Sequence, residues 1–328
     1  MTFTKKNTSE ATKQVLRDAV SITRDLYKIM IPLVIIVKVL QEMDLIRYLA
    51  APLSPVMQLV GLPGEMGFVW AAAIINGVYA GVILLAAFIE HTPLSTAQVT
   101  VICTMMLVAH SLPVELRIAQ KSGTRLVFQA ASRLLGAFVL GWLLYVFYGF
   151  TGALEAPARL LFSPESPPGG ASETLGMWGV GQARTFIGIF LIITVLIAGM
   201  RILEHFGVIR AVNRMLRPAL ALVGIGQGAS TVTMIGLTLG IAYGGGLIIH
   251  QAKSGAVPPR DLFFSITLMG LSHSLVEDTF LMIMIGAHIS GVLLARIAFS
   301  LAAVAVIAGV CRRLPKGWAE RFLWQGAT

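Results

Sequence analysis

Charged residues are scarce in this chain: Asp, Glu, Lys and Arg make up 12% of its 328 residues, whereas 56% are hydrophobic. Soluble domains carry about 25% charged residues, so the composition excludes an ordinary soluble globular protein. Long apolar runs occur throughout the chain, and about 20 such residues span a bilayer core. The composition therefore predicts an all-α integral membrane protein that contacts the lipid bilayer. The clearest runs cover residues 29–40, 68–89, 99–114, 126–147, 186–200, 233–249, 262–285 and 292–310.

Signatures of enzymes and disulfide-rich proteins are also missing. The two cysteines, Cys103 and Cys311, are too few and too distant for a disulfide framework. The chain has no Gly-x-x-x-x-Gly-Lys-Ser/Thr loop, which would indicate ATP-driven transport, and no His-Glu-x-x-His motif. Ser274, His273 and Asp278 have the residue types of a hydrolase. Because adjacent Ser and His on one helix point in different directions, we expect no enzyme.

The formal net charge is +9, but its distribution argues against nucleic acid as a partner. Most basic residues lie in short loops between apolar runs, which is the pattern of cytoplasmic loops in membrane proteins. A nucleic-acid-binding face would instead gather them on one surface. We therefore expect a multi-pass protein of the bacterial inner membrane with both termini in the cytoplasm.

An internal repeat organises the chain. When the sequence is shifted by 163 residues, rare polar residues and glycines align without a gap. Chance matching in a Leu- and Gly-rich chain would align scattered apolar residues, so the two halves are copies of one unit. The aligned pairs include Pro55/Pro218, Gly61/Gly224, Gly77/Gly240, His110/His273, Ser111/Ser274, Glu115/Asp278 and Arg133/Arg296.

The repeat divides the chain into five parts. Residues 1–28 have no signal-peptide core and place apolar residues at helical spacing, which predicts an amphipathic helix on the cytoplasmic surface. Residues 29–150 form the first membrane repeat and residues 186–311 the second. Residues 151–185 are rich in Pro, Gly and Ser and predict an extracytoplasmic linker. Residues 312–328 form a cytoplasmic tail.

Loop charge predicts how the copies are oriented. If residues 65–90 and 228–253 each enter and leave the membrane on one side, most basic loops fall in the cytoplasm. Each copy then has about three transmembrane helices plus one glycine-broken re-entrant segment, and an odd number of crossings gives the copies opposite topology. Five crossings per copy is also an odd number and would give the same opposite topology, so the choice between three and five stays open. Inverted repeats of this kind are typical of secondary transporters.

The paired His-Ser-Leu segments are the strongest candidate for a binding site. Ionisable groups at membrane depth cost several kcal/mol unless they are paired or hydrated, so they default to functional hypotheses. Imidazole and carboxylate suit a divalent metal, a coupling ion or a proton relay, and an interhelical hydrogen-bond cluster is the alternative. No cofactor is certain. The candidate substrate-binding or ion-binding residues here are His110, Ser111, Glu115, His273, Ser274, Glu277 and Asp278, and the candidate metal ligands are His110, Glu115, His273 and Asp278.

Glycine-rich breaks add polar and backbone groups at membrane depth. Irregular backbone survives there only inside protein or beside a cavity, although close helix packing through glycines is an equal alternative. Pro113 lacks an N–H and would free the carbonyl of Ala109. The breaks add Asn76 and Tyr243 to the binding candidates, and the gating candidates are Gly77, Gly81, Pro113, Gly240, Gly244 and Gly245.

Four cations lie within or near predicted spans. Lys38, Arg133, Arg201 and Arg296 are expected to extend toward the lipid headgroups, the commoner behaviour near helix ends. Arg296 lies deepest in its apolar run and is the one expected to pair with Glu277 or Asp278.

The order of apolar and Pro/Gly motifs resembles a known family. Residues 31–36, then 49–55 and 60–63, are similar to the opening of the nucleoside recognition, or gate, domain family, and Pro218 and Gly224 repeat part of the order. The family includes spore-maturation membrane proteins and the gate regions of ferrous-iron permeases. The resemblance, over about residues 29–149 and 188–310, implies a two-gate permease. No family binding residue carries over.

These observations favour a secondary transporter that moves a small polar solute by alternating access, with a metal or other cation slightly preferred. Few aromatic residues lie near the predicted site to stack a base, yet a nucleoside-type solute stays open. A non-transporting membrane scaffold or assembly protein is the third possibility. The sequence leaves the oligomeric state open, including a homo-oligomer.

Overall fold

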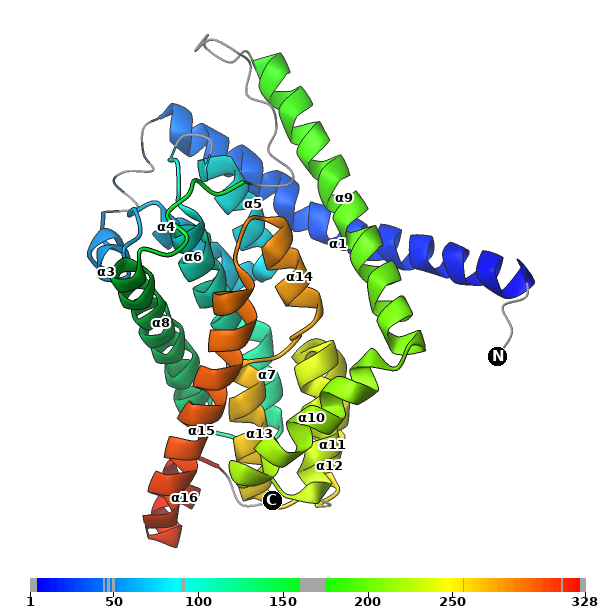
Figure 1. The fold of residues 1–328 in the computed structure, drawn as a ribbon, viewed down its shortest axis with the longest axis vertical. Coiled ribbons are helices and arrows are strands. Elements are labelled where there is room, and N and C mark those ends of the chain that lie inside the picture. The colour runs from blue at the N-terminus through cyan, green and yellow to red at the C-terminus, as the bar shows by residue number, and fades with distance from the viewer. Residues whose placement is uncertain are drawn as a thin grey trace.

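The computed structural model is helical throughout the residues that it describes, which are 5–43, 45, 48, 51–89, 92–159, 175–255, 257–313 and 315–324. These ranges contain no β-strand, only two isolated β-bridges. The expected all-α class is therefore confirmed (Figure 1). The first-half helices are α1 (Lys5–Glu42), α3 (Ser54–Leu59), α4 (Met66–Asn76), α5 (Val78–Ile89), α6 (Thr96–Val108), α7 (Leu112–Lys121) and α8 (Leu126–Thr151).

The second half has a matching series. It ends in a long helix that starts with a π-helical turn, η1 (Ser290–Ala295), and continues as α15 (Arg296–Arg313). The short α16 (Lys316–Phe322) follows. The remaining helices are α9 (Leu175–His205), α10 (Val208–Leu222), α11 (Gln227–Leu239), α12 (Ile241–Lys253), α13 (Pro259–Leu271) and α14 (Glu277–Met284).

Four helical stretches in the described residues are long and apolar enough to cross a membrane, judged by length and composition. The stretch Thr96–Lys121, which joins α6 and α7, is 78% buried inside the molecule, whereas the other three are 24–33% buried. The centre of the bundle is therefore α6, and the other three expose apolar faces that suit contact with lipid. The other three stretches are Leu126–Thr151, Gly176–Leu203 and Ser290–Arg313.

Two helical hairpins turn at glycines. Helix α4 ends at Asn76, Gly77 has a φ of 100°, and α5 folds back so that Gly81 lies against Val69 and Ala73. A side chain is disfavoured at such a φ, so glycine suits this turn. Gly240, with a φ of 92°, makes the corresponding break between α11 and α12.

Two further breaks carry the histidines. Helix α6 ends at Val108 and α7 starts at Leu112, with Ser111 between them at a φ of 48°. Helix α13 ends at Leu271, and Ser274 in the following segment also has a φ of 48°. A positive φ is uncommon outside glycine, so its recurrence at the same place in both halves marks a shared backbone design.

The two longest helices, α1 and α9, cross outside the packed body (Figure 1). Arg201 of α9 donates to Asp18 of α1 at 2.6 Å, and Tyr27 packs on Phe186 with ring centroids 4.9 Å apart. Helix α1 continues through residue 28, so no helix end marks the expected boundary between a surface helix and a first span. Residues 160–174 of the expected linker lie outside the described residues.

Candidate functional site

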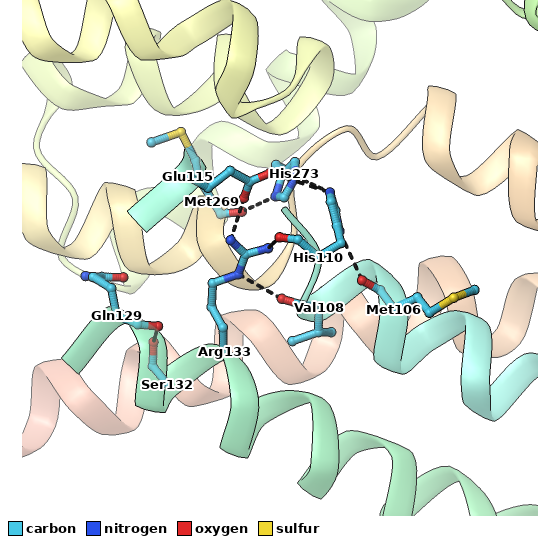
Figure 2. A network of polar contacts seen from close by, with 9 residues as sticks. All are labelled: Met106, Val108, His110, Glu115, Gln129, Ser132, Arg133, Met269 and His273. Carbon is cyan, nitrogen blue, oxygen red and sulfur yellow. Dashed lines mark hydrogen bonds and ion pairs between the residues drawn. The ribbon is translucent and has the colours of Figure 1, made fainter. Parts of the chain in front are cut away.

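The breaks after α6 and α13 bring the two histidines of the repeat together in the buried centre. The Nε2 atoms of His110 and His273 are 3.0 Å apart, although the residues are 163 positions apart in the chain. Both side chains are buried (Figure 2). Glu115 joins them from the first turn of α7, with its Oε1 3.6 Å from His110 Nε2 and 3.3 Å from His273 Nε2.

The hydrogen bonds of the two Nδ1 atoms determine whether the facing Nε2 atoms donate or accept. His110 Nδ1 lies 3.0 Å from the carbonyl oxygen of Met106, and His273 Nδ1 lies 2.8 Å from that of Met269. A carbonyl oxygen only accepts, so each Nδ1 carries the hydrogen and donates it. In neutral imidazoles both Nε2 atoms are then bare acceptors.

With both rings neutral, three acceptor atoms therefore face one another. Two imidazole nitrogens and a carboxylate oxygen at 3.0–3.6 Å repel one another unless a positively charged species lies among them. Three ligand atoms bound at about 2.0–2.1 Å in tetrahedral geometry are about 3.3 Å apart. The observed separations bracket that value, so the triangle fits a bound divalent ion with one position left open.

Arg133 of α8 holds the carboxylate from behind. Its Nη1 donates to Glu115 Oε2 at 2.5 Å, which leaves Oε1 facing the histidines. Its Nε and Nη2 donate to the carbonyl oxygens of Val108 and His110, both at 2.9 Å (Figure 2). These carbonyls belong to the break between α6 and α7, so one buried arginine orients both the carboxylate and the loop that carries His110. Groups that orient a ligand in this way tune a metal site.

A small cleft lies beside the ion pair. It is lined by Glu115, Arg133, Gln129 and apolar residues of α12 and α13, and it offers about 10 Å³ to the centre of a water molecule. That is about the space that one water needs. His110, His273, Glu115 and Arg133 are all buried, so electrostatic interactions among them are strong.

The structure brings together three of the four expected metal ligands. His110, Glu115 and His273 have ligand atoms within 4.8 Å of one another. Asp278 is buried but is not one of that group, and its Oδ2 has no hydrogen-bond partner among the described residues. Asp278 interacts electrostatically with Arg296, as expected. Glu277 also lies apart and accepts from the hydroxyl of Tyr79 at 3.4 Å.

The two serines, which were binding candidates, lie against the glycines of the hairpin turns. Ser111 and Ser274 lie in the breaks, where their Oγ atoms face Gly77 and Gly240. A Cβ added at Gly77 would lie 2.8 Å from Ser111 Oγ, and one added at Gly240 would lie 2.6 Å from Ser274 Oγ. The serines therefore join the histidine-bearing breaks to the hairpin turns.

The remaining candidates do not meet at the triangle. Asn76 is exposed at the end of α4, and Gly81 packs against Met106. Pro113 is the second residue of α7, where a missing N–H has no cost, so the break precedes it. The side chain of Tyr243 is outside the described set, and Gly244 and Gly245 lie inside α12 rather than at its break.

Two arginines that were expected to extend to the headgroups are instead buried. Arg133 is 2% exposed and Arg296 is 0% exposed. Arg296 corresponds to Arg133 in the repeat, but its Nε, Nη1 and Nη2 have no hydrogen-bond partner among the described residues. The sequence did not predict that Arg133 binds Glu115, although the alignment of Arg133 with Arg296 in the repeat could have indicated a role inside the bundle.

Comparison with known proteins supports the expected resemblance. Residues 24–122 match the Gate family model, described as "Nucleoside recognition". The chain is 28% identical over 284 residues to "Uncharacterized membrane protein YvoD" of Bacillus subtilis (strain 168), an alignment that covers 84% of this chain and 86% of the relative. No solved structure matches the chain. The chain is thus a multi-pass membrane protein whose residues 24–122 match the Gate nucleoside recognition model.

Proposed function

We propose that the protein is a permease of the bacterial inner membrane that moves a divalent metal cation through a site formed by His110, His273 and Glu115. The observation that carries the proposal is the convergence of three buried acceptor atoms at 3.0, 3.3 and 3.6 Å. Two nitrogens and one oxygen suit ions such as Zn²⁺, Fe²⁺ or Mn²⁺ better than Mg²⁺ or Ca²⁺, which prefer oxygen ligands.

The proposal includes inverted repeats that exchange conformations. Helix breaks and positive-φ residues recur at the same interval in both halves, which supports two copies of one unit. One histidine comes from each copy, so the site lies at their interface, as in transporters built from inverted repeats. The hairpins α4–α5 and α11–α12, with helices of 11–13 residues, are the proposed re-entrant segments.

The unequal arginines support two alternating states. In the first copy Arg133 is bonded to Glu115 and to two carbonyls, whereas in the second copy the guanidinium of Arg296 and the Oδ2 of Asp278 have no hydrogen-bond partner among the described residues. Arg296 and Asp278 interact only electrostatically. A buried charge without hydrogen bonds is costly, so a second conformation in which Arg296 donates directly to Asp278 would remove that cost. In an inverted-repeat carrier, exchange of the two arrangements would open the site to the opposite side.

A nucleoside-type solute is the second candidate, favoured by the description of the matching family model. Base recognition uses stacking on aromatic side chains, but the described groups within hydrogen-bonding or ionic reach of the triangle are two backbone carbonyls and Arg133. The metal candidate therefore has the stronger geometric support.

Metal binding is tested on the purified protein in detergent after treatment with a chelator. We expect Zn²⁺ or Mn²⁺ to raise the melting temperature of the native protein by mass action. His110→Ala should weaken binding at least about 100-fold, because it removes a ligand outright. His250→Ala is the matched control, since His250 is exposed at the end of α12.

The same proteins in liposomes then test transport. Metal uptake that His110→Ala abolishes and His250→Ala preserves would support the permease. A melting temperature that responds to nucleosides and to no metal would replace the metal proposal by the nucleoside candidate. A response to neither would favour a scaffold.

A further inference from the structure

A groove at one end of the bundle lies between the turn that joins α7 to α8 and the short helix α16. Its volume is about 660 Å³, within the range of small-molecule sites. Apolar and aromatic side chains form most of its wall, including Phe128, Trp318 and Phe322. Arg125 and Arg321 are the charged residues that line it.

The walls of this groove are held in place. Arg125 N–H donates to the carbonyl of Leu323 at 2.9 Å, and Thr124 forms an isolated β-bridge with Trp324. The Trp324 ring packs on Phe263 with centroids 5.2 Å apart. Helix α16 is therefore fixed to the bundle, and the groove is formed by ordered backbone on both sides.

Neither charged side chain of the groove pairs with an acidic side chain among the described residues. The Nε of Arg125 is buried and has no hydrogen-bond partner among the described residues. Arg321 lies over the ring of Phe322, 5.5 Å from its centroid. No Asp or Glu is found among the described residues that line the groove. The groove therefore offers two guanidinium groups to an anion, and further basic residues stand nearby at Arg117 and Lys121 on α7.

The apolar part of the groove continues along α8. Val127 and Ala131 line the groove, and Val127 is 77% exposed. At intervals of three or four residues, large apolar side chains with exposed surface follow on the same face of the helix. They are Leu135, Val139, Trp142, Val146 and Phe150. This face belongs to a helix of 26 residues, about 39 Å long, which crosses a bilayer.

We propose that this groove is a specific site for an anionic phospholipid, whose phosphate binds Arg125 and Arg321 and whose acyl chains lie along the exposed face of α8. A basic pocket at a helix end, continuous with an apolar face, matches both parts of such a lipid. A protein partner is less suited, because the face below the groove is part of a membrane span. The inference is independent of the metal site.

The test measures the melting temperature of the delipidated protein in detergent with added phosphatidylglycerol, phosphatidylcholine or inorganic phosphate. Phosphatidylglycerol should raise the melting temperature more than the zwitterionic lipid does. In Arg125→Gln/Arg321→Gln that excess should disappear, with binding about 30-fold weaker, because each basic group near the surface contributes about fivefold. The matched control is Arg214→Gln/Arg217→Gln, which removes two exposed arginines of α10 and should keep the excess.

A second variant distinguishes loss of the lipid site from a folding defect. Ala131→Trp leaves every charge in place but fills the exposed apolar part of the groove, so it should also remove the excess. An equal shift in wild type and both groove variants would overturn the proposal. A shift produced equally by inorganic phosphate would also overturn it, because the site would then bind a free anion rather than a lipid.

Discussion

Arg133 and Arg296 show how one residue type in equivalent positions can have unequal energetic roles. Arg133 donates three hydrogen bonds, one of them to a buried carboxylate, and it is 2% exposed. Arg296 is 0% exposed and has no hydrogen-bond partner among the described residues. Removing one partner of a buried ion pair is strongly destabilising, whereas replacing an unpaired buried charge by an apolar side chain can be neutral or stabilising.

We therefore expect Arg133→Met to destabilise the protein by about 3–5 kcal/mol, because Glu115 and two carbonyls lose their donor. Arg296→Met should cost less, because Arg296 makes no hydrogen bond among the described residues and loses only an electrostatic interaction with Asp278. Thermal or denaturant unfolding in one detergent compares the two variants. Equal losses would mean that Arg296 is bonded as Arg133 is, and the asymmetry between the repeats would have to be abandoned.

Removing the charge of Glu115 isolates its role at the proposed metal site. Glu115→Gln keeps an oxygen that can accept from Arg133 but supplies no negative charge to a cation. We expect the affinity for Zn²⁺ or Mn²⁺ to fall at least about tenfold. Calorimetric titration measures it, with Glu155→Gln, an exposed carboxylate after α8, as the control. Unchanged affinity would exclude Glu115 as a ligand.

At the scale of elements, short helices are joined by breaks that contact one another. The carbonyl of Ala73 in α4 accepts from Gly77 N–H at 2.9 Å and from Ser111 N–H at 3.0 Å. The hairpin turn and the histidine-bearing break of the first half are thus parts of one unit. In the second half Leu275 N–H donates to the carbonyl of Leu237 in α11 at 2.8 Å.

Gly77→Ala should disturb that unit. The φ of 100° disfavours a side chain, and the new Cβ would lie 2.8 Å from Ser111 Oγ. We expect a loss of about 1–3 kcal/mol of stability and weaker metal binding, since His110 adjoins Ser111. Gly149→Ala is the control, because nothing lies within 4 Å of its added Cβ in α8. Adding Ser111→Ala removes the hydroxyl oxygen that the new Cβ meets, so it should recover the part of the stability loss due to that contact. If stability does not recover, the loss comes from backbone strain at residue 77.

At the scale of the whole molecule, the proposed topology places basic loops in the cytoplasm. In a background without Cys103 and Cys311, a cysteine at Glu155 should react with an impermeant maleimide on intact spheroplasts, because it begins the proposed outer linker. A cysteine at Lys121 should react only after the membrane is opened. Both positions are exposed in the structure. The reverse pattern would invert the orientation, and labelling at both would contradict three crossings in the first copy.

The sequence alone was sufficient to predict the helical membrane class, the paired residues of the internal repeat and the family resemblance. Low charge and long apolar runs led to the helical membrane class, and the repeat picked out His110 with His273 and Glu115 with Asp278. The resemblance to the gate family was also readable from the order of Pro and Gly motifs, and the family model confirms it over residues 24–122. Each of these three predictions depends only on residue composition, spacing or order, which can be read from the sequence without knowing how the chain packs.

Only the tertiary structure decided which of those residues meet. His110 and His273 come within 3.0 Å across 163 residues, Arg133 turns inward to Glu115, and Asp278 stays outside the triangle. Helical spacing shows which residues share a face, but not which face of one half packs on the other. We expected the adjacent Ser and His to lie on one helix, whereas the positive φ of Ser111 and Ser274 breaks the helix there. Packing of the two halves therefore determines the site.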